Sequence, residues 1–173
     1  MKGVFFFLGE LNDQDIEWLL KRGRKQDLQP GTDLVQEGKP IDQMHFILAG
    51  GFRYSVARLG AEAQPVGVGE VIGEVSFVDS RPPTGTITAL TPSVVLSIPR
   101  PVLAAKLQDD VPFAARFYRA LSMMLAYRHR QWTTRQEGAG DPAAADQLDT
   151  NLLDTLHLAG ARFNRILTRL LGA

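Results

Sequence analysis

The residues best suited to chemistry lie in one glycine-containing segment, residues 69–86. Gly73 permits a backbone turn that other residues avoid, and residues 74–78 are long enough for one turn of helix. The N–H groups at the start of such a turn have no partner within the helix and can bind an anion such as a phosphate. Here those groups belong to Val75 and Ser76, so the segment indicates a site for a small anionic ligand.

Two charged side chains extend this site. Glu74, at the start of the turn, can accept hydrogen bonds from sugar hydroxyls, and Arg81 can pair with a phosphate. The plainer interpretations are a structural turn for Gly73 and Glu74 and a solvated turn for Arg81. If the site exists, residues 73–76 should line a cavity.

Other chemistry finds little support in the sequence. There is no cysteine, which excludes disulfides, thiolate metal sites and thiol catalysis. His45, His129 and His157 do not have the spacing of a zinc motif such as H-E-x-x-H, and we expect each to be at the surface or partly buried. Neither a Walker A sequence nor a G-x-S-x-G elbow occurs. We therefore expect no metal, no other cofactor and no enzymatic activity.

Charge and length set further limits. The formal net charge is zero, from 19 basic and 19 acidic side chains, so no global charge attracts nucleic acid or an anionic membrane. The 173 residues suit one domain with appendages. Residues 4–8 are apolar but too few for a signal peptide or a membrane span, and we expect them to pack on the body as an N-terminal strap. The protein is expected in the cytoplasm.

The elements that must position the site are mainly strands. From about residue 25 to residue 99, short β-prone runs alternate with glycine-containing turns, a pattern typical of a sandwich, barrel or jelly roll. Strands are expected over residues 32–37, 44–48, 52–56, 86–90 and 94–98. The predicted fold is mainly β with flanking helices, an antiparallel β-roll (double-stranded jelly roll), and no helix longer than two turns is expected between residues 25 and 69.

Helices are expected on both sides of the roll. The first begins at Asn12 or Asp13 and ends near Gly23. After the roll come a helix over residues 101–107, a long helix over 111–135, a glycine- and alanine-rich linker and a last helix over 147–171. The expected organisation is a domain over residues 1–135, a linker over 136–146 and an amphipathic C-terminal helix over 147–173.

The two last helices carry faces that need a partner. The stripe on the long helix is apolar at helical spacing and consists of Phe113, Phe117, Leu121, Met124 and Leu125. It can be covered by a second copy of the chain, which would make a homodimer, or by the last helix. The last helix is also basic beside its apolar face, at Arg162, Arg165 and Arg169. It can dock on a partner or a membrane, although packing back on the body is the plainer interpretation.

Three segments in order resemble the cyclic-nucleotide-binding domain family. The phosphate-binding cassette of that family reads Phe-Gly-Glu-Leu-Ala and then, about six residues later, Pro-Arg-Ala-Ala-Thr. Its matches here are Gly73, Glu74, Pro82 and Thr86. Residues 28–38 resemble the Pro-Gly…Glu-Gly hairpin of the family, and residues 44–50 its Tyr-Ile-Leu-x-Gly strand. The resemblance covers about residues 10–130 and implies a β-roll that binds cAMP or cGMP.

One position departs from the family. The arginine that pairs with the phosphate aligns with Pro83, which has neither a charge nor an N–H group. Loss of such a charge-assisted hydrogen bond costs about 1.5–3 kcal/mol. Arg81 lies two residues earlier and could reach in from there. The resemblance further implies that Thr84 contacts phosphate and base, and that Tyr127 or Arg128 closes over the base from the long helix.

Two functions remain open at this point. The first is a cyclic-nucleotide sensor without a DNA-binding domain, whose partners are a cyclic nucleotide or other small anionic ligand, a second copy and an unidentified protein. The second is a degenerate domain that has lost the nucleotide and serves in oligomerisation or docking. A transcription factor of the catabolite-activator type is not expected, and neither DNA nor a membrane is an expected partner. Residues 73–83 and 148–171 also resemble a cyanobacterial-type subgroup associated with bacteriocin-type transport.

Overall fold

The computed structural model describes residues 3–57, 64–136 and 150–172. The chain divides into two compact units, which are described separately below. One unit, mainly β, consists of Trp18–Lys106, and the other, helical, of Met1–Glu17 and Leu107–Ala173. The predicted linker over residues 136–146 lies almost wholly outside the described residues, so the predicted domain boundaries beside it stay predictions.

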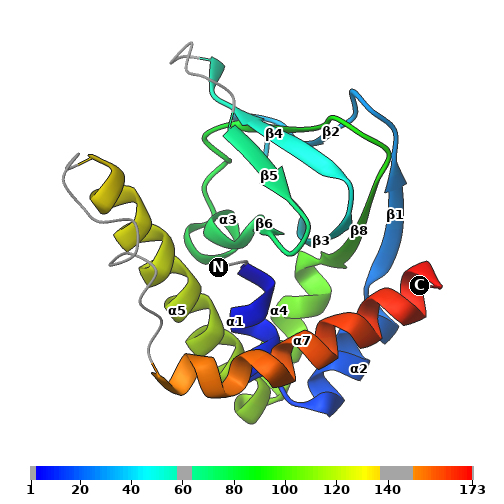
Figure 1. Cartoon of the computed structure of the whole chain (residues 1–173), viewed down its shortest axis with the longest axis vertical. Coiled ribbons are helices and arrows are strands. Elements are labelled where there is room, and N and C mark those ends of the chain that lie inside the picture. The colour runs from blue at the N-terminus through cyan, green and yellow to red at the C-terminus, as the bar shows by residue number, and fades with distance from the viewer. Residues whose placement is uncertain (1–2, 58–63, 137–149, 173) are drawn as a thin grey trace. The chain divides into compact units, whose positions relative to one another are not determined.

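The β unit contains two four-stranded antiparallel sheets (Figure 1). The strand order is β1-β8-β3-β6 in one sheet and β2-β7-β4-β5 in the other. The strands are β1 (Arg24–Leu28), β2 (Asp33–Val35), β3 (Gln43–Ala49), β4 (Gly51–Ser55), β5 (Gln64–Gly67), β6 (Val71–Ile72), β7 (Thr86–Ala89) and β8 (Ser93–Pro99). Except for β4 and β5, neighbours within each sheet are not consecutive in the sequence, and this arrangement confirms the predicted antiparallel β-roll.

The apolar core of this unit lies between the two sheets, because both contribute to it. Its buried members are Val35, Ile47, Phe52, Ile72, Ile87, Ala89 and Val95. Along β3 the alternation of a strand places Gln43, His45 and Ile47 on one face. Since Ile47 belongs to the core, this face of β3 is the inner one.

Each predicted strand overlaps an observed one, but β1, β5 and β6 were not predicted. β1 reads RKQDL and β5 reads QPVG, so neither shows an apolar alternation or a β-branched run. They exist because they pair with β8 and β4 along the two sheets. As predicted, the described residues between 25 and 69 include no helix longer than two turns.

The helical unit begins with a helix where the sequence predicted only a strap. α1 (Gly3–Glu10) reads GVFFFLGE, and its buried residues are Gly3, Val4, Phe6, Phe7 and Leu8. The run therefore packs on the body, as expected, but in helical form. A helix this apolar on most sides is stable only when it is surrounded by protein.

α2 (Asp13–Arg22) begins at the predicted place. The N–H of Asp15 donates to Oδ1 of Asn12 at 2.9 Å, and the N–H of Asn12 donates to Oδ2 of Asp15 at 2.8 Å. This reciprocal pair satisfies two N–H groups that the helix cannot use. The remaining long elements are α4 (Arg100–Asp109), α5 (Val111–Gln136) and α7 (Thr150–Leu171).

The apolar stripe of α5 packs against α1, a partner that the sequence did not predict. The ring centroids of Phe117 and Phe7 are 5.2 Å apart, and those of Tyr127 and Phe6 are 5.5 Å apart. Phe113, Phe117, Leu121 and Met124 are all buried. α7 in turn packs on α1, with the Phe5 and Phe163 rings in edge contact at 6.1 Å. The last helix therefore folds back on its own chain, but onto α1.

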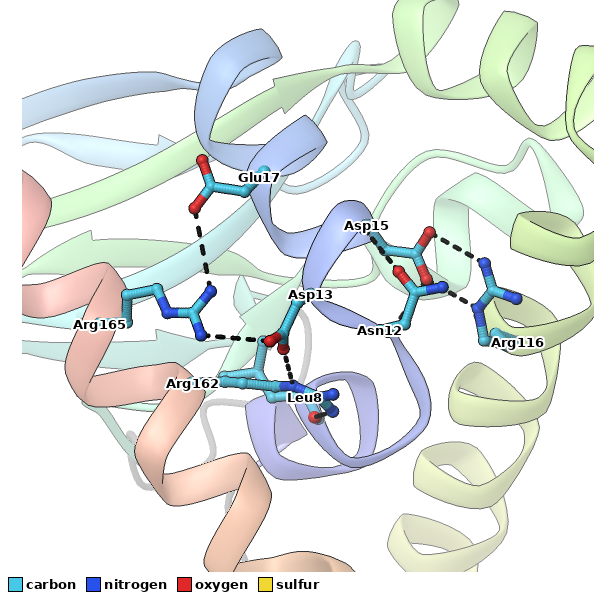
Figure 2. A network of polar contacts seen from close by, with 8 residues as sticks. All are labelled: Leu8, Asn12, Asp13, Asp15, Glu17, Arg116, Arg162 and Arg165. Atoms are coloured by element: carbon cyan, nitrogen blue, oxygen red, sulfur yellow. Dashed lines mark hydrogen bonds and ion pairs between the residues drawn. The ribbon is translucent and has the colours of Figure 1, made fainter.

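The basic face of α7 pairs with the acidic start of α2 (Figure 2). Nε of Arg162 donates to Oδ1 of Asp13 at 2.9 Å, and its Nη1 donates to the carbonyl oxygen of Leu8 at 2.7 Å. Nη2 of Arg165 donates to Oδ2 of Asp13 at 3.3 Å. The hydrogen bonds from Arg162 and then Arg165 lower the pKa of Asp13. Because Leu8 lies in the last turn of α1, Arg162 also caps a carbonyl that the helix leaves without a partner.

A second ion pair joins α5 to the same end of α2. Nε and Nη2 of Arg116 donate to the two carboxylate oxygens of Asp15 at 2.7 and 3.0 Å (Figure 2). The side chain of Asp15 is 4% exposed and that of Arg116 29%. The hydrogen bonds from Asp15 raise the pKa of Arg116. The start of α2 is thus the point at which arginines from both long helices converge.

Within the described parts of the chain, no helix has the length and apolarity needed to cross a lipid bilayer.

Candidate ligand-binding site

The segment singled out from the sequence forms a short helix after a glycine turn. α3 (Glu74–Asp79) follows β6, and Gly73 precedes it in the left-handed region, with φ +91° and ψ 0°. The first helical hydrogen bond runs from the N–H of Phe77 to the carbonyl oxygen of Gly73, at 2.9 Å. The N–H groups of Val75 and Ser76 come before that bond, so the helix does not use them. This local geometry is the one expected for an anion-binding turn.

Gly73 is required here for two separate reasons. Its positive φ is costly for any residue with a Cβ atom. A Cβ placed on it would also lie 2.7 Å from the carbonyl oxygen of Gln43 in β3. Of the residues that follow, Glu74 and Ser76 are buried, with 5% and 6% exposed, whereas Val75 is 53% exposed. The start of α3 is therefore held closely against β3.

The end of α3 is held by Arg100, a residue that the sequence analysis missed. Nη2 of Arg100 donates to Oγ of Ser80 at 2.7 Å and to the carbonyl oxygen of Phe77 at 3.3 Å. Its guanidinium also lies 5.6 Å from the centre of the Phe77 ring. A cation at a helix C-terminus is favourable because the last carbonyl oxygens are partly negative. Nothing local in the sequence could have revealed this contact, because 20 or more residues separate its partners.

Arg81, the candidate phosphate partner, lies in solvent. Its side chain is 84% exposed, and Nε lies 4.0 Å from Oδ2 of Asp79. Its backbone N–H donates to Oδ1 of Asp79 at 3.0 Å. An exposed pair of this length contributes little. The position fits the solvated turn that was the plainer interpretation of Arg81, and its ligand role stays a prediction.

Pro83 and Thr84 connect the cassette to neighbouring parts of the roll. The carbonyl oxygen of Pro83 accepts a hydrogen bond from the N–H of Gly38 at 2.9 Å. The hydroxyls of Thr84 and Tyr54 are 3.2 Å apart. A Cβ at Gly85 would lie 2.4 Å from the Tyr54 ring, so that ring packs directly on the Gly85 backbone. Tyr54 also packs against the apolar core, and it is a second residue of this site that the sequence analysis missed.

The two residues predicted to close over the base belong to the helical unit. Tyr127 contacts Phe6, and its hydroxyl oxygen accepts a hydrogen bond from Nε2 of Gln131 at 3.3 Å. Arg128 is partly buried on α5. Their role as a lid stays a prediction, as does a cavity lined by residues 73–76.

The histidines correct one expectation. His129 and His157 are exposed, as predicted, but His45 is buried with 5% of its surface exposed. It lies on the inner face of β3, where its Nδ1 is 2.8 Å from the hydroxyl oxygen of Ser97, so the inside of the roll holds a buried polar pair. Among the described residues, no group of three or more His, Asp or Glu side chains could hold a metal ion.

Residues 25–110 match the sequence model of a family described as "Cyclic nucleotide-binding domain". This part of the chain is a cyclic nucleotide-binding domain. The matched range includes both sheets of the described roll, apart from the first residue of β1, and the whole of α3. No curated protein sequence matches the chain.

Solved structures confirm the fold of the cyclic nucleotide-binding domain. The N-terminal domain of a transcriptional regulator from Streptomyces coelicolor A3(2) is 28% identical, with a TM-score of 0.59 over 67% of this chain and 85% of that one. A cyclic nucleotide-binding domain from Methylobacillus flagellatus KT is 20% identical, with a TM-score of 0.69 over 81% of this chain and 85% of that one. The catabolite activator protein of Thermus thermophilus is 16% identical, with a TM-score of 0.56 over 94% of this chain and 84% of that one. Proteins with this fold therefore include regulators.

Proposed function

We propose that the chain is a regulatory sensor module that binds a cyclic nucleotide, or another small anionic ligand, at α3. The N–H groups of Val75 and Ser76 bind the phosphate, and Glu74 accepts hydrogen bonds from the ribose hydroxyls. The observation that carries the proposal is the left-handed turn at Gly73 leading into α3 within a cyclic nucleotide-binding domain. Arg100 supports it by holding the other end of α3.

In this proposal backbone N–H groups bind the phosphate, without a buried cationic side chain beside them. Pro83 stands where the family has an arginine, and the side chain of Arg81 is 84% exposed. Thr84, the residue after Pro83, adds a neutral hydroxyl, which is weaker than a guanidinium as a phosphate ligand. We therefore propose a low affinity for the nucleotide, with Tyr127 and Arg128 as contributors from α5.

The arginine position offers a gain-of-affinity test. Pro83→Arg should raise the affinity for cAMP or cGMP by about tenfold or more, because it adds a charge-assisted hydrogen bond to the phosphate. The hydrogen bond from Gly38 to residue 83 is kept, since its acceptor is a backbone carbonyl. Isothermal titration calorimetry of the wild type and the variant with both nucleotides measures the change.

Pro82→Arg is the matched control, because it adds the same charge at the neighbouring, exposed position. The affinity of this variant for either nucleotide should stay within about twofold of the wild type, as expected for a surface charge that does not contact the phosphate. An equal gain in both variants would mean that the added charge acts only through long-range attraction, against the proposed site.

The second candidate function is a degenerate domain that serves in docking or oligomerisation. It is favoured by the Tyr54 ring, which packs on Gly85 inside the roll and reaches Thr84 with its hydroxyl. A side chain in that place reduces the room for a base. Absence of binding heat with either nucleotide, in the wild type and in Pro83→Arg alike, is the result that supports this function over the sensor.

We also propose that the chain forms a homodimer through α5. The buried stripe of α5 is used by α1, so a dimer would have to use the outer side of the helix, where Val111 is 72% and Tyr118 48% exposed. Light scattering at high micromolar concentration should then give twice the mass of one chain, and Tyr118→Asp should shift it towards one. A single-chain mass for the wild type at that concentration contradicts the homodimer.

The remaining parts of the proposal concern output. We propose that the module is not an enzyme, acts in the cytoplasm and signals to a protein partner rather than to DNA. The similarity to regulators supports the regulatory role. Membership of the subgroup associated with bacteriocin-type transport stays a proposal that rests on residues 73–83 and 148–171 alone.

A further inference from the structure

The β unit has a hollow that does not involve the cassette. It has a volume of about 320 Å³ and is lined from β1, β2, β3 and the turn between β2 and β3. None of the residues 73–86 lines it. Ligand sites in proteins have volumes of about 300 Å³ upward, so its size is sufficient for a small molecule.

Four polar side chains at this hollow form a hydrogen-bond chain with a defined direction. Nε2 of Gln26 donates to Oε1 of Gln43 at 3.4 Å, and Oγ of Ser97 donates to Oε1 of Gln26 at 3.0 Å. The Ser97 hydroxyl has one proton, and it is used in this bond. Its oxygen, 2.8 Å from Nδ1 of His45, must therefore accept a proton from that nitrogen.

The chain fixes the tautomer of His45. With the proton on Nδ1, the other ring nitrogen, Nε2, has a lone pair and is a hydrogen-bond acceptor. Burial lowers the pKa of His45 to about 4, despite the opposing effect of Asp42. The ring is therefore neutral near pH 7, and Nε2 keeps its lone pair.

Nε2 is accessible from the hollow. His45 is one of the lining residues. Within the described part of the chain, no hydrogen bond to Nε2 is found, and no fully buried side-chain nitrogen or oxygen lacks a partner. A nitrogen that has no partner and is not fully buried is at least partly exposed, and His45 lines the hollow.

The charged side chains around the hollow favour a cation. They are Asp33, Asp42 and Lys39, which sum to one negative charge beside the neutral His45. Asp33 already accepts hydrogen bonds from Thr88 at 2.7 Å and Gln36 at 3.3 Å. Asp42 is exposed, and the described residues include no hydrogen bond of its carboxylate. Asp42 is therefore the carboxylate available to a ligand.

Apolar side chains supply the rest of the lining. Leu28, Val35 and Ile41 line the hollow; Val35 is a buried member of the apolar core, and Leu28 and Ile41 pack against that core. Small-molecule sites commonly combine such an apolar wall with a few directed polar groups. A ligand that suits this hollow has a short apolar body and a charged head with N–H donors.

We propose that this hollow is a second ligand site, for a small organic cation of the amidine class. One N–H of its charged head donates to Nε2 of His45, and another pairs with the carboxylate of Asp42. Its apolar body lies against Leu28, Val35 and Ile41. The site does not depend on nucleotide binding at α3, and each of the two proposals can hold without the other.

The test uses three probes of one shape and different charge: benzamidine, benzamide and benzoate. Each is titrated into the full chain, with binding followed by the backbone and His45 ring resonances in NMR spectra. Benzamidine should bind at least about tenfold more tightly than benzamide, as expected for hydrogen bonds to a charged group, and benzoate should not bind. Asp42→Asn should reduce the benzamidine affinity to that of benzamide.

His45 provides the readout that a nonspecific cation effect would not change. Long-range proton–nitrogen spectra of the free protein should show the proton on Nδ1, and benzamidine should shift the resonance of the bare Nε2. His45→Leu should reduce the benzamidine affinity about tenfold, while His157→Leu, on exposed α7 surface, should leave it unchanged. If His45→Leu does not fold, Ser97→Ala takes its place and should abolish the preference for the Nδ1 proton.

Three results would overturn the proposal. They are a proton on Nε2 in the free protein, equal binding of benzamidine and benzamide, and an unchanged affinity in Asp42→Asn. The titrations contain no nucleotide, so their failure leaves the function proposed for α3 unaffected, and the calorimetry with cAMP and cGMP does not bear on this hollow.

Discussion

Replacing Gly73 by alanine is expected to lower the free energy of unfolding by about 2–5 kcal/mol. A residue with a Cβ at positive φ costs about 1–2 kcal/mol, and Gly73 has φ +91°. The added Cβ would also lie 2.7 Å from the Gln43 carbonyl oxygen, a backbone atom that cannot turn aside. Forcing an extra carbon into a packed site costs about a further 1–3 kcal/mol. Urea denaturation of wild type and variant measures the sum.

Gly31→Ala separates the two contributions. Gly31 has a similar φ of +86°, but a Cβ there would meet nothing within 4 Å. This variant should lose only the conformational part, about 1–2 kcal/mol. Equal losses in the two variants would contradict the close contact between Gly73 and β3. In Gly73→Ala, any nucleotide binding at α3 should disappear as well, because the N–H groups of Val75 and Ser76 depend on this turn.

Arg116→Met is expected to destabilise the protein by about 3–5 kcal/mol, the range for breaking a buried ion pair. The carboxylate of Asp15 has a side-chain exposure of 4% and is bound by Nε and Nη2 of Arg116 at 2.7 and 3.0 Å. Methionine keeps the apolar stem of the arginine but, among the described residues, leaves that charge with only the N–H of Asn12. Thermal and urea denaturation give the change.

Arg119→Met is the matched control on the same helix. Arg119 pairs with Glu10 at 3.2 Å, but its side chain is 68% exposed, so its removal should cost about 0–1 kcal/mol. Adding Asp15→Asn to Arg116→Met should recover part of the loss, because it removes the charge that was left unpaired. The double variant could be less stable than Arg116→Met alone, or Arg116→Met and Arg119→Met could lose equal stability. Either result would show that loss of the Arg116–Asp15 ion pair does not cause the destabilisation.

Much of the fold could be predicted because the local sequence pattern favours the same strands and helices that the whole chain forms. The observed β3 and β8 extend the predicted strands by a residue at each end, and α5 ends one residue beyond the predicted helix. β3 and β8 are mostly apolar runs that are buried along nearly their whole length, and α5 buries Phe113, Phe117, Leu121 and Met124 of its predicted stripe. β1 is different, because its polar sequence forms a strand only through pairing with β8. The N-terminal run of phenylalanines is also different, since its helical form depends on packing against α5 and α7.

The sequence by itself determined the glycine turn at Gly73, the helical turn after it and the substitution of proline for the family arginine. Each of these depends on backbone preferences within a few residues. Only the tertiary structure decided that Arg100 holds α3, that Tyr54 packs on Gly85 and that His45 is buried beside Ser97. It also decided that α1 covers the stripe of α5. The physical reason is that these contacts join residues far apart in the chain, and their side chains meet only after the strands and helices have packed.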